Sequence, residues 1–130
     1  FVDPVPEIDM LSARGMQAIM THPERYRYLH GSITRPQEWV EAGAALQVTA
    51  GSLVGDFGQR AYDHAWKLIR AGLVALVATD AHDAAERPPR LAAAIEFLTH
   101  QVGHEAARTI AVDNPLRVIE GAPLRTMQVA

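Results

Sequence analysis

Short apolar stretches recur along the chain and are separated by polar segments. Three of them have the length of buried parallel strands: residues 16–21, 44–49 and 73–79. Polar residues follow them at once, because the first stretch ends at His22 and the third is followed by Asp80 and His82. We therefore predict three parallel strands, each ending at a loop, with the second ending in a turn over residues 50–52.

Between and after these stretches, apolar residues recur at the spacing of an amphipathic helix. Proline in the first turn and glycine after the last turn mark several of the boundaries, as at Pro36 and Gly72. The predicted helices cover residues 6–14, 36–41, 59–71, 88–102 and 104–112, and Asn114 caps a last short helix that ends at Gly121. Alternation of strands and helices predicts the α/β class, with helices packed on a parallel sheet.

The chain has the size of a single folding unit. With 130 residues, 48% of them hydrophobic, it can bury one core. We assign residues 1–121 to one domain and residues 122–130 to a tail, which shows no clear pattern and is expected to be loose. Because the chain begins at Phe1 and the first helical pattern follows at once, we expect it to be a piece of a longer protein.

Composition excludes several classes of function. The formal net charge of −3 gives no basic stripe for neutralising nucleic-acid phosphates. The chain has no cysteine, which excludes disulfides and thiolate metal sites and agrees with a cytoplasmic location. No apolar run approaches the roughly 20 residues needed to span a bilayer, and no signal peptide opens the chain, so membrane insertion is not expected.

Candidate metal ligands follow two of the predicted strands. His22 comes after the first strand, and Asp80 and His82 come after the third. Reactive groups of β/α barrels lie at these strand ends, and residues two apart in an extended backbone point to the same side. Imidazole and carboxylate ligands without sulfur suit zinc, manganese or iron(II). The alternative is a capped turn at Asp80 with two unrelated histidines.

Two arginines follow the same strand ends. Arg25 lies three residues after His22, in a loop that turns sharply because Pro23 prevents a helix from running through His22, and Arg87 lies just before a predicted helix. A guanidinium group binds two phosphate oxygens at once, so both arginines are candidate phosphate ligands. The alternative is that they pair with nearby acids such as Glu24 or Glu86.

Other polar and aromatic residues have simpler interpretations. The glycine-bearing segment 47–58 either brings backbone N–H groups close to a phosphate or only makes a tight turn. Trp39 and Trp66 are expected in the core. Surface positions are expected for the histidines without a paired ligand: His30, His64, His100 and His104.

Three sequence blocks together resemble a known family. They are residues 21–26 (Thr-His-Pro-Glu-Arg-Tyr), residues 47–58, and residues 79–82 (Thr-Asp-Ala-His) with Arg87 and the two prolines after it. Their order and spacing are similar to those of the PHP (polymerase and histidinol phosphatase) type protein-tyrosine phosphatases of capsule and exopolysaccharide loci. The similarity extends from about Phe1 to Gly121.

This resemblance implies a fold, an activity and a site. The fold would be the C-terminal portion of a distorted seven-stranded β/α barrel, similar to a TIM barrel. The activity would be hydrolysis of phosphotyrosine on a partner tyrosine kinase, with a cluster of up to three metal ions, usually Mn²⁺, although Zn²⁺ or Fe²⁺ also suits the ligands. His22, Asp80 and His82 would be metal ligands, and Arg25 and Arg87 would hold the phosphate.

The sequence also departs from that family. The family's N-terminal half supplies a His-x-His pair, another histidine and acidic ligands, and none of them can be placed in this chain. We therefore expect the isolated chain to be weakly active or inactive, and its uncovered sheet edges to favour a homo-oligomer. The alternatives are a PHP-type phosphatase for small molecules such as histidinol phosphate, and a non-catalytic binding or scaffold module.

Overall fold

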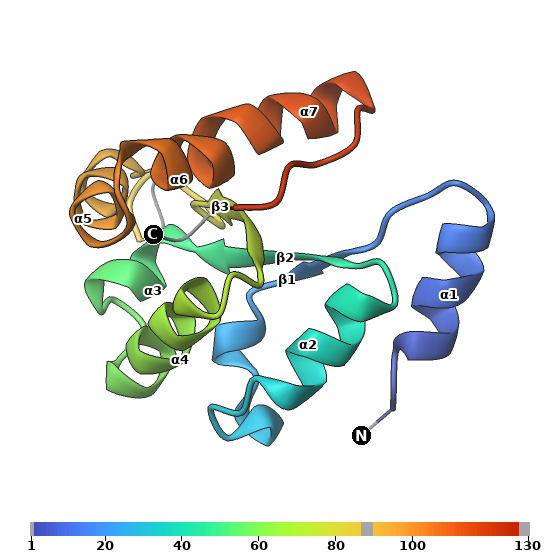
Figure 1. The fold of residues 1–130 in the computed structure, drawn as a ribbon. Coiled ribbons are helices and arrows are strands. Elements are labelled where there is room, and N and C mark those ends of the chain that lie inside the picture. Colours follow the sequence, from blue (N-terminus) through green and yellow to red (C-terminus); the bar gives the residue numbers. More distant parts are fainter. Residues whose placement is uncertain (1, 87–89, 128–130) are drawn as a thin grey trace.

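A three-stranded parallel sheet, in the order β1-β2-β3, lies at the centre of the computed structural model, which describes residues 2–86 and 90–127 (Figure 1). The strands are β1 (Ile19–Thr21), β2 (Ala45–Thr49) and β3 (Val74–Ala78). Each lies within a predicted apolar stretch, so the predicted parallel sheet is confirmed. The sheet is open, and the barrel that the resemblance implies stays a prediction.

Strand β1 is shorter than predicted, and its residues are more exposed than those of the other strands. It pairs with β2 alone, and Met16 and Ile19 are 48% and 37% exposed. Strand β2 lies between its two neighbours and is almost wholly buried. Strand β3 is also an edge strand but is mostly buried and has five residues, so the short β1 goes with the exposure of its own residues and not with the edge position alone.

The register of the sheet brings the carboxyl ends of its three strands to the same end of the sheet. Thr21 of β1 is opposite Gln47 of β2, and Thr49 of β2 is opposite Ala78 of β3. The pairing of β2 with β3 is irregular between Leu46 and Gln47. Because all strands run in parallel, the segments that follow them leave the sheet on the same side.

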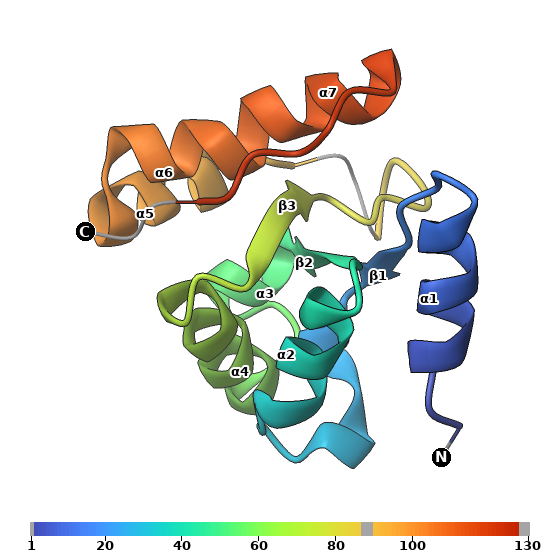
Figure 2. The ribbon, with the colours of Figure 1, turned by 45° about the vertical axis from the view of Figure 1, so that its right-hand side comes forward.

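Helices surround the sheet on several sides (Figures 1 and 2). Both views show α2, α3 and α4 on one side of the sheet, the run from α6 to α7 on the other, and α1 beside α2. The helices are α1 (Val5–Ala13), α2 (Thr34–Glu41), α3 (Ala50–Val54), α4 (Gln59–Arg70), α5 (Ala92–Val102), α6 (His104–Arg108) and α7 (Asn114–Glu120). The shorter turns are the 3₁₀ turns η1 (Pro23–Arg25) and η2 (Arg27–Leu29) and the π turn η3 (Thr109–Asp113).

The core is formed by the sheet and the helices around it, and besides residues of α2 to α5 it includes Ile8 of α1, Ala106 of α6 and Ile110 of η3. Trp39 is fully buried and Trp66 is 2% exposed, as predicted. The Trp66 ring packs edge-on against Phe97 of α5, and its Nε1 donates a hydrogen bond to the carbonyl oxygen of Leu53 at 3.3 Å. A buried indole thereby keeps a partner for its one polar atom, as such a side chain requires.

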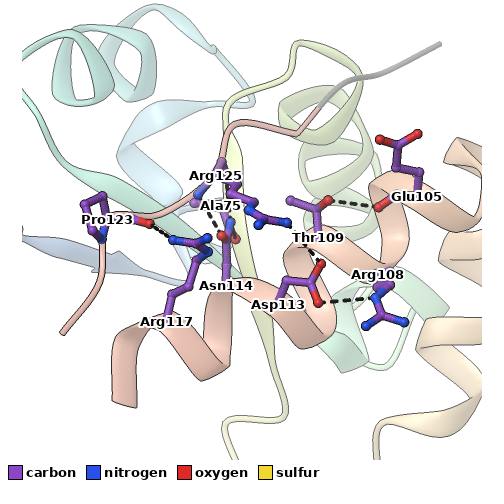
Figure 3. A network of polar contacts seen from close by, with 9 residues as sticks. All are labelled: Ala75, Glu105, Arg108, Thr109, Asp113, Asn114, Arg117, Pro123 and Arg125. Carbon is purple, nitrogen blue, oxygen red and sulfur yellow. Dashed lines mark hydrogen bonds and ion pairs between the residues drawn. The ribbon is translucent and has the colours of Figure 1, made fainter. Parts of the chain in front are cut away.

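Asn114 does not cap a helix, contrary to the prediction. The chain is helical on both sides of it, and its side chain is fully buried (Figure 3). Its Nδ2 donates to the carbonyl oxygens of Ala75 and Arg125, and its Oδ1 accepts from the backbone N–H of Arg125, all at 2.8 Å. Asn114 therefore joins β3 to the C-terminal segment, a tertiary role that its position before Pro115 concealed.

The C-terminal segment is held against the domain as far as it is described. Arg117 donates to the carbonyl oxygen of Pro123 at 2.8 Å, and Arg125 lies 3.9 Å from the Asp113 carboxylate (Figure 3). Met127 is 3% exposed and belongs to the core. Residues 122–127 are therefore packed rather than loose.

Replacing Asn114 by alanine is expected to lower the free energy of unfolding by about 2–3 kcal/mol, because buried groups of Ala75 and Arg125 lose their partner. Chemical denaturation measures this change. The control is Gln37→Ala, which removes an exposed amide bonded to Glu41 of the same helix and is expected to cost less than about 0.5 kcal/mol. Equal effects of the two substitutions would show that Asn114 does not join these segments.

Candidate functional site

The ends of β1 and β3 are joined by an ion pair. Arg25, in the 3₁₀ turn after β1, places Nη1 2.9 Å from Oδ2 of Asp80, which follows β3. The two side chains are 27% and 20% exposed, so water partly screens the pair and its contribution is about 1 kcal/mol. Arg25 pairs with the candidate ligand Asp80, and the pairing with Glu24 that sequence left open is wrong.

Two of the predicted metal ligands adopt an unusual backbone conformation. His22 has φ 41° and Asp80 has φ 53°, in the left-handed region that side chains with a Cβ atom seldom enter. The backbone N–H of His22 donates to the carbonyl oxygen of Gln47 at 2.7 Å, which fixes the turn at the end of β1. Strands β1 and β3 are thus each followed by an abrupt change of direction at a candidate metal ligand.

The His22 ring lies in a protected environment. Its Nδ1 is buried and has no hydrogen-bond partner among the described residues. The Tyr26 ring packs edge-on against it, with ring centroids 5.6 Å apart. Burial raises the pKa of the Tyr26 hydroxyl above its ordinary value of 10.0, so this neighbour is neutral at pH 7.

His82 lies near Asp80 for a different reason from the one predicted. The backbone at Asp80 is left-handed rather than extended, so the spacing of two does not by itself align the side chains. Instead, Nδ1–H of His82 donates to the carbonyl oxygen of Asp80 at 2.7 Å. In the neutral ring this bond leaves the lone pair of Nε2 for a ligand, an arrangement common among metal-binding histidines.

Phe57 packs against the guanidinium group of Arg25. The Cζ atom of Arg25 lies 4.2 Å from the centre of the ring. Phe57 follows α3, which starts directly after β2, so the predicted turn over residues 50–52 is wrong and these residues are helical. Position 51 is crowded, since an added Cβ would lie 2.9 Å from Cε2 of Phe57 and 3.1 Å from Oδ2 of Asp56.

Glu24 is a residue of the site that sequence analysis missed. It lies between His22 and Arg25 in the chain but is 2% exposed. Its Oε1 accepts hydrogen bonds from the backbone N–H of Thr49 at 2.9 Å and from Oγ of Ser52 at 2.7 Å. The only sequence signal was its place inside the motif, because a loop glutamate is ordinarily solvated.

His64 of α4 is also buried, so its predicted surface position is wrong. It is 2% exposed, with Nε2 3.0 Å from the carbonyl oxygen of Ser32 and Nδ1 3.4 Å from that of Glu24. Lys67, one turn further on, donates to the carbonyl oxygen of Gly31 at 3.0 Å. Helix α4 therefore supports the loop that carries Glu24 and Arg25.

Comparison with known proteins identifies the family of this chain. The family model for capsular polysaccharide synthesis proteins of the CpsB/CapC type matches residues 5–120. The chain belongs to the CpsB/CapC family. This match covers all the strands and every described residue of the site.

Relatives of the chain are named tyrosine-protein phosphatases. The tyrosine-protein phosphatase YwqE of Bacillus subtilis is 35% identical over 95 residues, which is 73% of this chain and 37% of that protein. The tyrosine-protein phosphatase CpsB of Streptococcus pneumoniae is 27% identical over 110 residues, or 81% of this chain and 45% of that protein.

A solved chain shares the fold of this CpsB/CapC member. It belongs to the crystal structures of YwqE from Bacillus subtilis and CpsB from Streptococcus pneumoniae, which are described as metal-dependent tyrosine phosphatases. The TM-score is 0.88 at 27% identity, over 97% of this chain and 51% of the solved one. The chain therefore spans about half or less of the length of these relatives.

The predicted metal site is incomplete in the part of the chain that is described. Residues 2–86 and 90–127 contain no group of three His, Asp or Glu side chains placed to hold a metal ion. The donors that are present do suit a divalent cation, because His22 has a buried ring nitrogen without a partner and Asp80 supplies a carboxylate. Arg87 lies outside the described residues, so its predicted role stays a prediction.

One groove in the described part of the chain lies apart from this site. Its volume is about 490 Å³, and it is lined by Met16, Ile19, Val118 and Leu124 among others. These residues lie near the amino ends of the strands or on α7 and the segment after it. Its distance from the ion pair follows from the parallel sheet, whose two ends carry different loops.

Over the described helices, none is long and apolar enough to cross a membrane.

Replacing Gly51 by alanine is expected to lower the free energy of unfolding by about 1–3 kcal/mol, because the new methyl group overlaps the Phe57 ring. The same substitution in a Phe57→Ala background is the control, and there the penalty is expected to shrink to the part that comes from Asp56, whose Oδ2 would lie 3.1 Å from the new Cβ. Denaturation of the four proteins in this double-mutant cycle measures the coupling. An equal cost in both backgrounds would mean that Phe57 is not what requires a glycine.

Proposed function

We propose that this chain carries one part of the active site of a metal-dependent tyrosine phosphatase. Its substrates would be phosphotyrosine proteins of capsule or exopolysaccharide assembly. The observation that carries the proposal is the meeting of Arg25 and Asp80, a candidate phosphate ligand and a candidate metal ligand, at the carboxyl ends of β1 and β3. Support also comes from the relatives YwqE and CpsB, which are named tyrosine-protein phosphatases.

Each residue has a separate task in this proposal. Arg25, together with Arg87, binds the non-bridging phosphate oxygens and offsets the charge that develops on them. His22, Asp80 and His82 would hold the divalent ion, which would supply a water activated for attack on phosphorus near neutral pH. Phe57 keeps the Arg25 guanidinium in place by stacking against it.

Four further features belong to the same proposal. The chain would be the C-terminal portion of a PHP-type β/α barrel, and Mn²⁺ would be the metal. A bacterial tyrosine kinase in the cytoplasm would be the substrate. The exposed edge of β1 would favour pairing with another strand, either of a longer chain or of a second copy.

Arg25→Ala in the full-length protein is expected to reduce the rate on phosphotyrosine peptides at least tenfold without changing metal content, because a phosphate ligand is lost. Arg27→Ala, a nearby exposed arginine, is the control and should retain the rate. Steady-state kinetics on phosphotyrosine peptides and on histidinol phosphate measure both activity and substrate class. An unchanged rate for Arg25→Ala would remove it from the site, and a preference for histidinol phosphate would favour small substrates.

His22→Ala and Asp80→Ala in the full-length protein are each expected to reduce bound manganese, because each removes a donor. Elemental analysis after equilibration with Mn²⁺ measures the metal content. His30→Ala is a matched control, since His30 is an exposed histidine that also has a positive φ of 49°. Full occupancy in the His22 and Asp80 variants would contradict the assignment of these ligands.

A further inference from the structure

We infer that Glu24 is a positioning residue for Arg25, and that it acts through hydrogen bonds to the end of β2 rather than through contact with the substrate or metal. This inference rests on the proposed function for its effect on activity. Its structural basis is the buried carboxylate inside the turn that also carries Arg25.

The carboxylate of Glu24 connects two strand ends that are distant in the sequence. Both of its hydrogen bonds use Oε1, and both donors belong to the junction of β2 with α3, namely Thr49 and Ser52. Thr49 and Ser52 are themselves fully buried. The Glu24 carboxylate accepts both hydrogen bonds from buried donors. A hydrogen bond to a charged acceptor is stronger than one between neutral groups, so the connection is rigid.

Geometry explains why a rigid connection at Glu24 controls Arg25. The 3₁₀ turn η1 has only three residues, and Glu24 is its middle one. Anchoring the Glu24 side chain inward on β2 leaves the neighbouring Arg25 side chain directed toward Asp80 and Phe57. Without the anchor, the turn would keep its own backbone bonds, such as the one from Arg25 N–H to the carbonyl oxygen of His22, and its contact with α4, but no side-chain bond to β2.

Helix α4 holds the same turn from the other side. The ring of His64 has Nε2 3.0 Å from the carbonyl oxygen of Ser32 and Nδ1 3.4 Å from that of Glu24, and a neutral ring donates to only one of them. The hold of α4 on the turn therefore rests on the packing of α4 against η1, while Oε1 of Glu24 fixes the side chain. Arg25 is thus attached to a turn secured by β2 and by α4. A loop held at two points offers a phosphate a preorganised guanidinium, which reduces the ordering cost on binding.

The alternative is that the Glu24 charge itself takes part in chemistry as a base or metal ligand. Oε2 is buried and has no partner among the described residues, so this alternative must be tested. The two interpretations differ in what Glu24→Gln does. The amide oxygen of glutamine can accept both hydrogen bonds from Thr49 and Ser52, but the residue has lost its charge and cannot act as a base.

The first experiment measures kcat and KM of the full-length protein on a phosphotyrosine peptide. Glu24→Ala is expected to lower kcat/KM at least tenfold, and Glu24→Gln to restore it to within about threefold of the unmodified protein. In a Glu24→Ala/Arg25→Ala double variant the loss should equal that of Arg25→Ala alone, because Glu24 acts through Arg25. Additive losses, a Glu24→Gln variant as poor as Glu24→Ala, or a fully active Glu24→Ala variant would each overturn the inference.

Loss of folding is separated from loss of positioning by two further variants. Leu98→Ala empties a fully buried position in α5 and destabilises the core without touching the turn, so its kcat/KM should be unchanged while it is folded. Ser52→Ala removes one of the two donors and keeps the carboxylate in place. If Glu24→Ala does not fold, Ser52→Ala tests the inference in its place. A drop in kcat/KM of at least twofold is then expected for Ser52→Ala, and an unchanged kcat/KM overturns the inference.

A second experiment does not depend on activity. Relaxation of the Arg25 Nε–Hε group, followed by nuclear magnetic resonance in the 130-residue chain, reports how ordered the guanidinium is. We expect order in the unmodified chain and in Glu24→Gln, and increased motion in Glu24→Ala. Unchanged order in Glu24→Ala would overturn the inference and leave the proposed function standing. Increased motion without any phosphatase activity in the full-length protein would overturn the proposed function instead.

Discussion

The arrangement of the candidate site depends on the hydrogen bonds that the buried Glu24 carboxylate accepts at the end of β2. A parallel sheet brings its strand ends to one edge but leaves the loops free to diverge. Glu24 removes that freedom, because a buried carboxylate must keep its hydrogen bonds and its donors lie at the end of the neighbouring strand. The turn after β1 is thereby held beside β2, and Arg25 reaches across to Asp80 after β3.

Local backbone features direct the other side chains of the site. His22 and Asp80 both enter the left-handed region, at a conformational cost of about 1 kcal/mol each. The chain therefore leaves β1 and β3 abruptly, and the polar side chains that follow these two strands remain close to the strand ends. Gly51 permits the close approach of Phe57, whose ring in turn limits the motion of Arg25. Together these contacts give a short loop the precision that a phosphate ligand needs.

The fold could largely be predicted from the sequence, and the support of the site could not. Apolar stretches over residues 44–49 and 73–79 became β2 and β3 because their pattern is local. The burial of Glu24 and the tertiary role of Asn114 depend on partners 25 and 39 residues away, respectively, which no local pattern reveals. His22 and Asp80 could be named as candidate ligands because strand ends are where barrel enzymes place chemistry, whereas their backbone conformation required the structure.

The most direct test of the account is a crystal structure of the full-length protein grown with manganese and inorganic phosphate, with anomalous scattering used to locate the metal. The account predicts manganese in contact with His22, Asp80 and His82, and phosphate bound by Arg25, whose turn is still anchored by Glu24. Manganese and phosphate bound at the opposite ends of the strands, with Arg25 facing solvent, would contradict it.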